Sequence, residues 1–250
     1  MRSSVDAYLE RIGLDERPSI DVAGLEILQR AHLSAVPFEN LDVYARRGVR
    51  TDLDWSVEKV VERGRGGWCF EVNGAFSDLL TRLGFRVHRL LATVLIPPPS
   101  SLPSHLTLEV ILDRSYLVDV GFGDSFIRPL VLDLTDRQDG GSGDYVIQSR
   151  DGIFALSQVA ADGTLNPQYQ FDRTPHEMKD YTEHSERLQA DNELSWRKKP
   201  FATRLLSGGP DRVTLLRDTL KFRRDGTWTE EPVTDDDWET ELDRWFSMEA

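Results

Sequence analysis

The segment Arg65–Asn73 constrains the fold of this chain more than any other stretch of its sequence. It contains Cys69, the only cysteine in 250 residues, shortly after the Gly66-Gly67 pair. We therefore predict that Cys69 lies at or near the start of a helix and is entered through a flexible turn. Apolar side chains recur after it at helical spacing, on one face of an α-helix expected to end at Gly84: Val72, Phe76, Leu79, Leu80 and Leu83.

A cysteine at a helix start lies beside free backbone N–H groups and the positive end of the helix dipole. Both favour the thiolate, which is the nucleophilic form of the side chain. A lone cysteine is also often a buried, unreactive residue. The position of Cys69 alone therefore leaves a catalytic and a structural role open. No metal site is expected, because one cysteine and five scattered histidines give none of the recognised ligand spacings.

Composition narrows the class of protein. An apolar fraction of 39% supplies a core for one large domain or two to three small ones. A net charge of −13 argues against nucleic acid as the main partner. One cysteine excludes an intramolecular disulfide and suggests a reducing compartment. We expect no signal peptide and no membrane span, because neither the start of the chain nor any later run is apolar enough. A soluble, cytoplasmic protein is therefore expected.

The periodicity of the sequence changes near residue 85. Residues 1–85 are predicted to be mostly helical, with a helix at about 22–35 that ends before Pro37. Alternating patterns typical of strands follow, and a closing amphipathic helix contains Trp238 and Leu242. Helices first, then strands, then a mixed end indicate an α+β fold. Strands are expected within residues 85–96, 105–122, 145–147, 153–156, 212–216 and 219–222, whereas residues 160–195 show too little periodicity to place an element.

The most informative strand pattern is a hairpin from His105 to Phe122. With a three-residue loop at 112–114, Thr107 pairs with Asp119, and the apolar side chains gather on one face. His105 and Asp119 then become diagonal neighbours on the polar face. A histidine fixed by a carboxylate is the general-base half of a nucleophilic triad, which Cys69 would complete by docking on that face. The alternative is that both side chains face solvent on a half-exposed hairpin.

Several segments of the chain resemble motifs of the arylamine N-acetyltransferase family. The first is Arg65–Asn73, which is similar to the nucleophile motif of that family. His105 opens a strand after a proline-containing loop, as the catalytic histidine of the family does. Val36–Asp42 is similar to a second family motif, and Val118–Gly123 is similar to the segment that carries the catalytic aspartate of the family. Lys198-Lys199-Pro200 and Arg212–Leu215 are more weakly similar to stretches in the last domain of the family.

The resemblance implies an N-terminal helical bundle, a central β-barrel and a C-terminal α/β lid around a cysteine-protease-like catalytic core. The corresponding boundaries are 1–85, 86–190 and 191–250. It also implies a ping-pong reaction in which Cys69 accepts an acetyl group from acetyl-CoA and passes it to an aromatic amine or hydrazine. The site residues it implies are Cys69, His105 and Asp119 as the triad, Phe38 and Phe122 in the acceptor pocket, and Gly121 and Gly123 beside CoA.

Other functions share this pattern. An amide synthase of the same family closes a macrolactam from a carrier-bound acyl chain and would keep the triad without a CoA site. A thiol hydrolase also uses a Cys-His-Asp arrangement. A binding module with an inactive triad is the alternative that is not an enzyme. Phe38 and Phe122 are compatible with plain core packing, and Gly121 and Gly123 with a strand-end turn. The sequence leaves the oligomeric state open.

Overall fold

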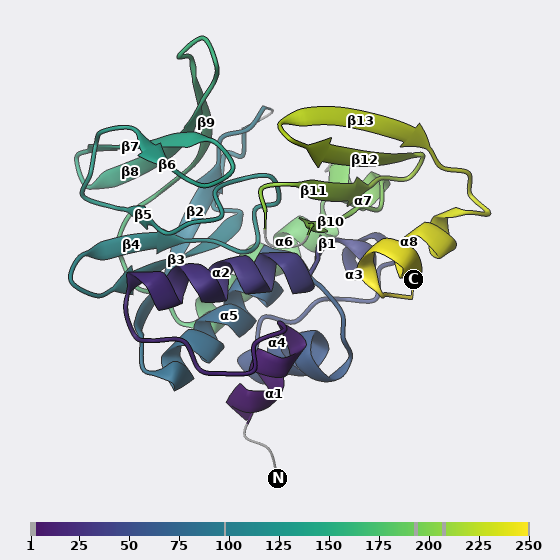
Figure 1. Ribbon diagram of the computed structural model, residues 1–250, viewed down its shortest axis with the longest axis horizontal. Coiled ribbons are helices and arrows are strands. Elements are labelled where there is room, and N and C mark those ends of the chain that lie inside the picture. The colour runs from purple at the N-terminus through teal and green to yellow at the C-terminus, as the bar shows by residue number, and fades with distance from the viewer. Residues whose placement is uncertain (1–3, 98, 193–194, 207–208, 250) are drawn as a thin grey trace.

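The computed structural model describes residues 4–97, 99–192, 195–206 and 209–249. Helices form the lower part of the molecule in Figure 1, with a curled sheet and a smaller sheet side by side above them. The helices are α1 (Ser4–Arg11), α2 (Val22–Ala35), α3 (Leu41–Tyr44), α4 (Leu53–Val57), α5 (Cys69–Leu83), α6 (Thr182–Ala190), α7 (Ser195–Lys198) and α8 (Trp238–Phe246), with a π-helical turn at Glu58–Glu62 and a 3₁₀ turn at Met178–Tyr181.

The strands form two antiparallel sheets. The larger is an eight-stranded sheet, in the order β5-β4-β3-β2-β9-β8-β7-β6, that curls into a nearly closed barrel. Its strands are β2 (Arg86–Val94), β3 (His105–Ile111), β4 (Ser115–Val118), β5 (Leu130–Val131), β6 (Gln138–Asp139), β7 (Asp144–Arg150), β8 (Ile153–Val159) and β9 (Leu165–Phe171). The smaller, five-stranded sheet contains β1 (Phe38–Glu39), β10 (Ala202–Leu205), β11 (Arg212–Leu215), β12 (Thr219–Arg224) and β13 (Thr227–Pro232), in the order β1-β10-β11-β12-β13.

The α+β fold class is confirmed, with a helical part, a barrel and a C-terminal sheet carrying α8. We call this C-terminal sheet with α8 the lid. The division into three domains at residues 85 and 190 stays a prediction. Contacts of the described residues cross its boundaries: for example, β1 pairs with β10 of the lid, and Thr51 bonds to Thr182 of α6 at 2.8 Å between hydroxyl oxygens.

Helix α5 begins at Cys69, where the sequence predicted a helix start. The Glu71 carboxylate accepts a hydrogen bond from the backbone N–H of Trp68 at 3.2 Å, which caps one free donor of the first turn. The helix ends at Gly84, as predicted, and its apolar face packs on β2 and β3. This packing holds the first turn of α5 against the barrel.

The predicted hairpin register is confirmed. Ile111 pairs with Ser115, and Leu108 pairs with Val118, as the three-residue loop requires. The half-exposed alternative is wrong, because the side chains of His105, Thr107 and Asp119 on the polar face are all at most 3% exposed. The physical reason is that the barrel closes over this face while α5 covers the other. Long-range packing therefore buries both faces of the hairpin.

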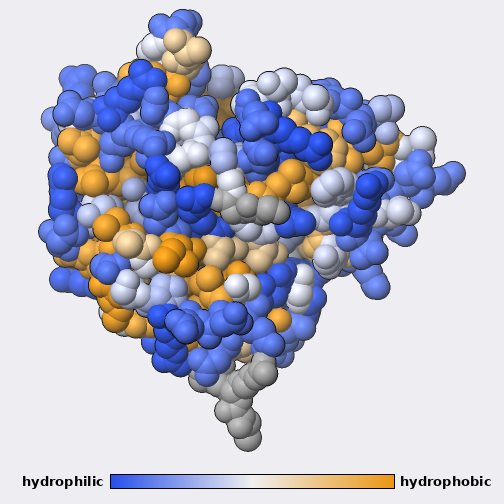
Figure 2. Space-filling model, viewed as in Figure 1, coloured by the Kyte–Doolittle hydropathy of each residue, from blue (hydrophilic) through white to orange (hydrophobic). Residues whose placement is uncertain are grey.

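Apolar side chains gather in three core clusters. One joins the helices to the apolar face of the hairpin, one fills the barrel, and the third lies between the lid sheet and α8. Figure 2 shows a mainly polar surface with an apolar band across the middle of the face that α2 occupies. None of the helices in the described ranges is both long and apolar enough to cross a membrane. The segment at 160–195, where no element was predicted, contains β9, the 3₁₀ turn and α6.

Candidate active site

Cys69 lies at the junction of the helical part and the barrel. It is the first residue of α5 and is 7% exposed. The turn before it is held by backbone bonds, because Gly67 N–H donates to Pro37 O at 3.3 Å and Glu39 N–H donates to Gly67 O at 2.9 Å. The segment that resembles the upstream family motif thus fixes the entry to the nucleophile helix.

His105 and Asp119 form a buried pair beside Cys69. His105 Nε2 and Asp119 Oδ2 are 2.6 Å apart, and the two residues are 2% and 3% exposed. His105 also forms a hydrogen bond with the Cys69 thiol. Since Nε2 bonds to the carboxylate, Nδ1 is the ring nitrogen that is left for this bond. The structure therefore brings together all three members of the predicted triad, in the order thiol, imidazole, carboxylate.

The charges of this pair are strongly coupled. Burial opposes the imidazolium, but Asp119 and then Cys69 outweigh it and raise the pKa of His105 to about 10. Burial also opposes the Asp119 carboxylate, but the charge and hydrogen bond of His105 hold its pKa below the ordinary value. At neutral pH the pair is an imidazolium beside a carboxylate. Such an imidazolium stabilises a thiolate at its other nitrogen.

Asn73 fixes the carboxylate of Asp119 from the second turn of α5. Its Nδ2 donates to Asp119 Oδ1 at 2.9 Å and to Leu106 O at 2.7 Å, while its Oδ1 accepts the N–H of Val120 at 2.9 Å. Sequence reasoning gave Asn73 no role, although a signal existed. It follows Cys69 by four positions, so both lie on the same face of the helix.

Phe122 and Phe38 lie together in an open cleft of about 610 Å³ beside the triad. The Phe122 ring is 5.1 Å from the His105 ring between centroids, and Phe38 packs on Phe201 at 5.3 Å. The chain turns at Gly123, whose φ of +93° is one that other residues rarely adopt. Strand β4 already ends at Val118 and residues 120–125 form a bend, so Phe122 lies beside His105, although an extended strand would place Asp119 and Phe122 on opposite faces.

The two glycines of this loop are placed differently. A Cβ on Gly121 would lie 2.8 Å from the Cα of Cys69, so glycine is required here for the close approach of α5. Gly123 lines the cleft beside Phe38. The cleft therefore reaches Gly123, whereas the absent side chain of Gly121 faces the nucleophile helix.

The N-acetyltransferase family model matches residues 21–250 of the chain. The chain belongs to the arylamine N-acetyltransferase family. Among curated relatives, the Salmonella typhimurium arylamine N-acetyltransferase / N-hydroxyarylamine O-acetyltransferase is 36% identical over 160 residues, which is 62% of this chain and 57% of that protein. The Escherichia coli arylamine N-acetyltransferase is 32% identical over 187 residues, or 72% and 66% of the two chains.

Solved structures of arylamine N-acetyltransferases share this fold along most of the chain. The Salmonella typhimurium enzyme has a TM-score of 0.92 at 29% identity, covering 99% of this chain and 92% of that one. A Mycobacterium marinum arylamine N-acetyltransferase in complex with CoA has a TM-score of 0.89 at 26% identity, covering 97% and 92%. The curated sequence matches are shorter and span 57% and 56% of the first two relatives.

In this arylamine N-acetyltransferase family member, two residues from distant parts of the sequence also contact the triad or its neighbours. The Tyr169 ring lies 5.1 Å from the His105 ring, and its hydroxyl bonds to Thr107 at 3.2 Å. Gln29 of α2 donates from Nε2 to the backbone carbonyl of Asp119 at 3.3 Å. No local pattern marks either residue, because only the folded barrel and helix bring them to His105 and Asp119.

A buried charge cluster lies beneath the first turn of α5. Lys59 is 2% exposed, and its Nζ lies 2.8 Å from Glu71 Oε1, 2.7 Å from Asp42 Oδ2 and 3.9 Å from Glu39 Oε1. Burial opposes its charge, but these three carboxylates raise the pKa of Lys59 above its ordinary value. Arg65 adds a second cation, 3.1 Å from Glu39. The cluster ties the family motif at 36–42 to the nucleophile segment.

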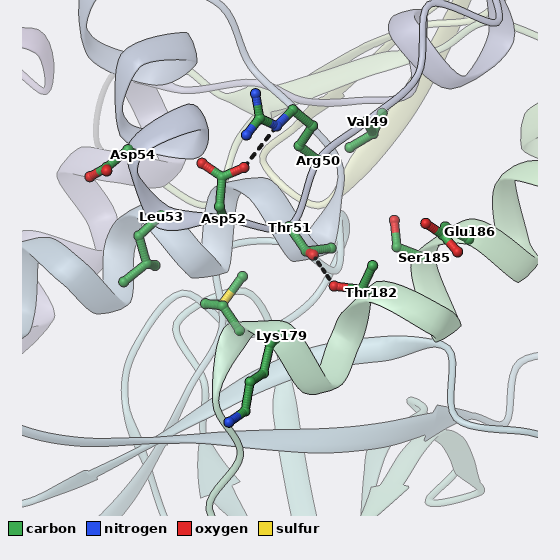
Figure 3. Close-up of a pocket in the computed structure, with 11 residues that line it drawn as sticks. Val49, Arg50, Thr51, Asp52, Leu53, Asp54, Lys179, Thr182, Ser185 and Glu186 are labelled. Carbon is green, nitrogen blue, oxygen red and sulfur yellow. Dashed lines mark hydrogen bonds and ion pairs between the residues drawn. The ribbon is translucent and has the colours of Figure 1, made fainter.

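A second cleft of about 590 Å³ lies between the start of α4 and α6 (Figure 3). Charged side chains line it, among them Lys179 and the Arg50–Asp52 ion pair at 2.8 Å. None of the predicted site residues lines it. Within the described ranges, no group of three or more His, Cys, Asp or Glu side chains is arranged to hold a metal ion.

Proposed function

We propose that this protein is an acetyl-CoA-dependent arylamine N-acetyltransferase that works through an acetyl-Cys69 intermediate. The observation that carries the proposal is the buried 2.6 Å contact of His105 Nε2 with Asp119 Oδ2, with the other nitrogen facing the thiol at the start of α5. The names of the matched relatives and the CoA complex of the Mycobacterium marinum protein support the choice of donor and acceptor.

In the first half-reaction, the Cys69 thiolate attacks the carbonyl carbon of the acetyl thioester. The bond from this carbon to the sulfur of CoA breaks, and the imidazolium of His105 gives its proton to the leaving CoA thiolate. An acetyl thioester on Cys69 remains. Asp119 and Asn73 hold the imidazole in the orientation that this transfer needs.

In the second half-reaction, the nitrogen of the aromatic amine attacks the acetyl group on Cys69. His105, now neutral, accepts the proton of the amine as the carbon–sulfur bond breaks, and the Cys69 thiolate is restored. Splitting the transfer in this way replaces one difficult step by two easier ones. The Phe38 and Phe122 rings in the cleft offer flat apolar surfaces for the aromatic acceptor.

The free thiol also bears on the cellular compartment of the protein and on its reaction partners. A thiol that must stay free to react needs a reducing compartment, so we place the protein in the cytoplasm. Its reaction partners are then two small molecules, CoA thioester and arylamine or arylhydrazine. Gly123, which lines the cleft, is the better of the two glycines for contact with either of them.

Mixing the purified protein with acetyl-CoA alone tests the function. We expect one acetyl group to be added to the intact mass of the protein, with peptide mapping placing it on Cys69. Addition of an arylamine should remove the adduct and yield the acetamide. A protein that takes no acetyl group from acetyl-CoA would contradict the proposal and favour the carrier-dependent amide synthase, whereas an adduct lost equally fast without amine would indicate a thiol hydrolase.

Phe122→Ala tests the acceptor site. Loss of one aromatic contact of about 1 kcal/mol should lower kcat/KM for the arylamine roughly fivefold or more. In ping-pong kinetics, kcat/KM for the donor reports only the first half-reaction, and we expect it to change much less. Phe122→Leu keeps most of the side-chain volume, so its kcat/KM for the arylamine should lie between the values of the unmodified protein and of Phe122→Ala. Equal losses for donor and acceptor would place Phe122 in packing against His105 rather than in the acceptor site.

A further inference from the structure

Lys59 is a buried cation that takes no part in either half-reaction. It lies in the π-helical turn at Glu58–Glu62, where the N–H of Arg63 donates to the carbonyl of Glu58, five positions back, at 3.1 Å. Wide turns of this kind are rare in proteins and occur frequently at functional sites. The side chains of Glu58 and Glu62 are exposed, whereas that of Lys59 is 2% exposed. The turn therefore directs this one charge inward, towards the first turn of α5.

The carboxylate of Glu71 links Lys59 to the segment that carries the nucleophile. Both of its oxygens bond to Lys59 Nζ, at 2.8 and 3.0 Å. Oε2 also accepts the N–H of Trp68 at 3.2 Å, and a Cβ on Gly67 would lie 2.7 Å from the same oxygen. The carboxylate thus lies directly against the backbone that leads into Cys69.

The charge of Glu71 has two opposite effects at this place. A carboxylate in the first turn stabilises a helix, because it caps free N–H groups and complements the helix dipole. The same charge repels a thiolate on Cys69, only two residues away. Glu71 is 1% exposed, so little water screens this repulsion. Its ion pair with Lys59 offsets the charge and leaves the hydrogen bond with the Trp68 N–H in place.

The other charges of the cluster leave this task to Lys59. Arg65, the second cation, lies 3.1 Å from Glu39 and 3.5 Å from Asp42, on the other side of the cluster. Burial raises the pKa of Glu71, and Lys59 opposes that shift while Glu39 and Asp42 add to it. Without Lys59, Glu71 would stay beside two further carboxylates and lose its ion-pair partner.

The remaining titratable groups near the thiol come from the barrel and from the 3₁₀ turn. His105 bonds to the Cys69 thiol, and Asp119 holds the charge of His105. Burial raises the pKa of Tyr181 in the 3₁₀ turn, so its hydroxyl is uncharged at neutral pH. On the helix side of Cys69, the charge therefore depends on the balance between Glu71 and its partner.

We propose that Lys59 is a positioning residue for the nucleophile: by neutralising Glu71, it lets this carboxylate cap the first turn of α5 without repelling the Cys69 thiolate. The thiolate is then flanked by two ion pairs, His105–Asp119 on the barrel side and Lys59–Glu71 on the helix side. The proposal rests on the proposed function for the role of Cys69, and it adds a residue that acts through Glu71 rather than by touching a substrate.

The pH profile for alkylation of Cys69 by iodoacetamide, followed by intact mass, tests the role of Lys59. Alkylation needs the thiolate and no acetyl-CoA. In Lys59→Met, the rate at neutral pH should fall about tenfold, and the acid limb of the profile should move up by about one pH unit. At alkaline pH, where the thiol is ionised in both proteins, the two rates should converge.

Glu71→Gln is the matched variant, because the amide oxygen still accepts the Trp68 N–H but carries no charge. Its acid limb should move to lower pH, opposite to that of Lys59→Met, and the double variant Lys59→Met/Glu71→Gln should return to within about threefold of the unmodified rate. Arg82→Met removes an exposed cation paired with Asp78 at the far end of α5, and it should leave the profile unchanged.

Shifts of opposite sign exclude a purely structural role, since loss of packing would slow both single variants alike. The proposal would be overturned by equal slowing in both without recovery in the double variant, or by an unchanged profile in folded Lys59→Met. If Lys59→Met does not fold, Glu71→Gln still decides, because an acid limb that stays in place or moves up contradicts the charge balance. A missing acetyl adduct in the unmodified protein would contradict the proposed function and leave these alkylation profiles valid.

Discussion

Cys69→Ala is expected to remain folded and to lose acyl transfer by at least about 10⁴-fold, because no other group can form the thioester. The side chain is 7% exposed, and besides its bond with His105 it makes a long contact of 3.9 Å from Sγ to Ser104 O. Removing one small buried group costs about 1 kcal/mol of unfolding free energy. The measurement is arylamine acetylation with acetyl-CoA, together with the melting temperature.

Cys69→Ser is the matched variant for this prediction. It keeps a polar atom at the start of α5 but replaces the thiol with a hydroxyl, which is far less acidic. We expect it to be nearly as inactive as Cys69→Ala and to carry no acetyl adduct. Appreciable arylamine acetylation by either folded variant would remove Cys69 from the reaction and leave the mechanism without its intermediate.

Asp119→Asn is expected to lower kcat by about 10³- to 10⁴-fold, because the amide favours the wrong imidazole tautomer and no longer stabilises the imidazolium. The amide also breaks a buried ion pair, so unfolding should become easier by about 3 kcal/mol or more. Steady-state kinetics and thermal unfolding of the same preparation measure both effects. The donors from Asn73 Nδ2 and Gly121 N–H would remain to hold the amide oxygen.

The stability loss in Asp119→Asn should depend on pH. The pKa of His105 is raised from 6.5 to about 10, so its contribution is fully present below pH 6.5 and is lost as pH rises through about 10. The pKa of Asp119 is lowered from 3.8, so its contribution is present above pH 3.8 and is lost as pH falls. The difference in melting temperature between the two proteins should therefore be largest between these limits and shrink towards pH 10.

A fully active Asp119→Asn protein would mean that another acid orients His105. Two candidates are Glu71, close to Cys69 in the sequence, and Asp124, close to Asp119, and the structure gives both of them other partners. Glu71 bonds to Lys59 at 2.8 Å, and Asp124 bonds to Arg223 at 2.7 Å. A melting-temperature difference that does not change with pH would also contradict the ionised pair, because a neutral pair contributes equally across this range.

The sequence by itself determined the local elements around the site. Helical spacing after Cys69 and the glycine at residue 84 fixed α5, and alternation from His105 to Phe122 fixed the hairpin register that makes His105 and Asp119 neighbours. These features depend on side-chain period and on contacts between residues close in the chain. The family motifs, which are also local, pointed to the nucleophile, its base and the orienting acid.

Only the tertiary structure decided how these pieces are buried and what surrounds them. Closure of the barrel buried the polar face of the hairpin and raised the pKa of His105, which a half-exposed hairpin would not do. Tyr169 and Gln29 come from segments whose side chains carry no pattern that refers to Cys69. Contacts between residues far apart in sequence depend on how whole elements pack, and that packing is set by the summed burial of many apolar side chains rather than by any short motif.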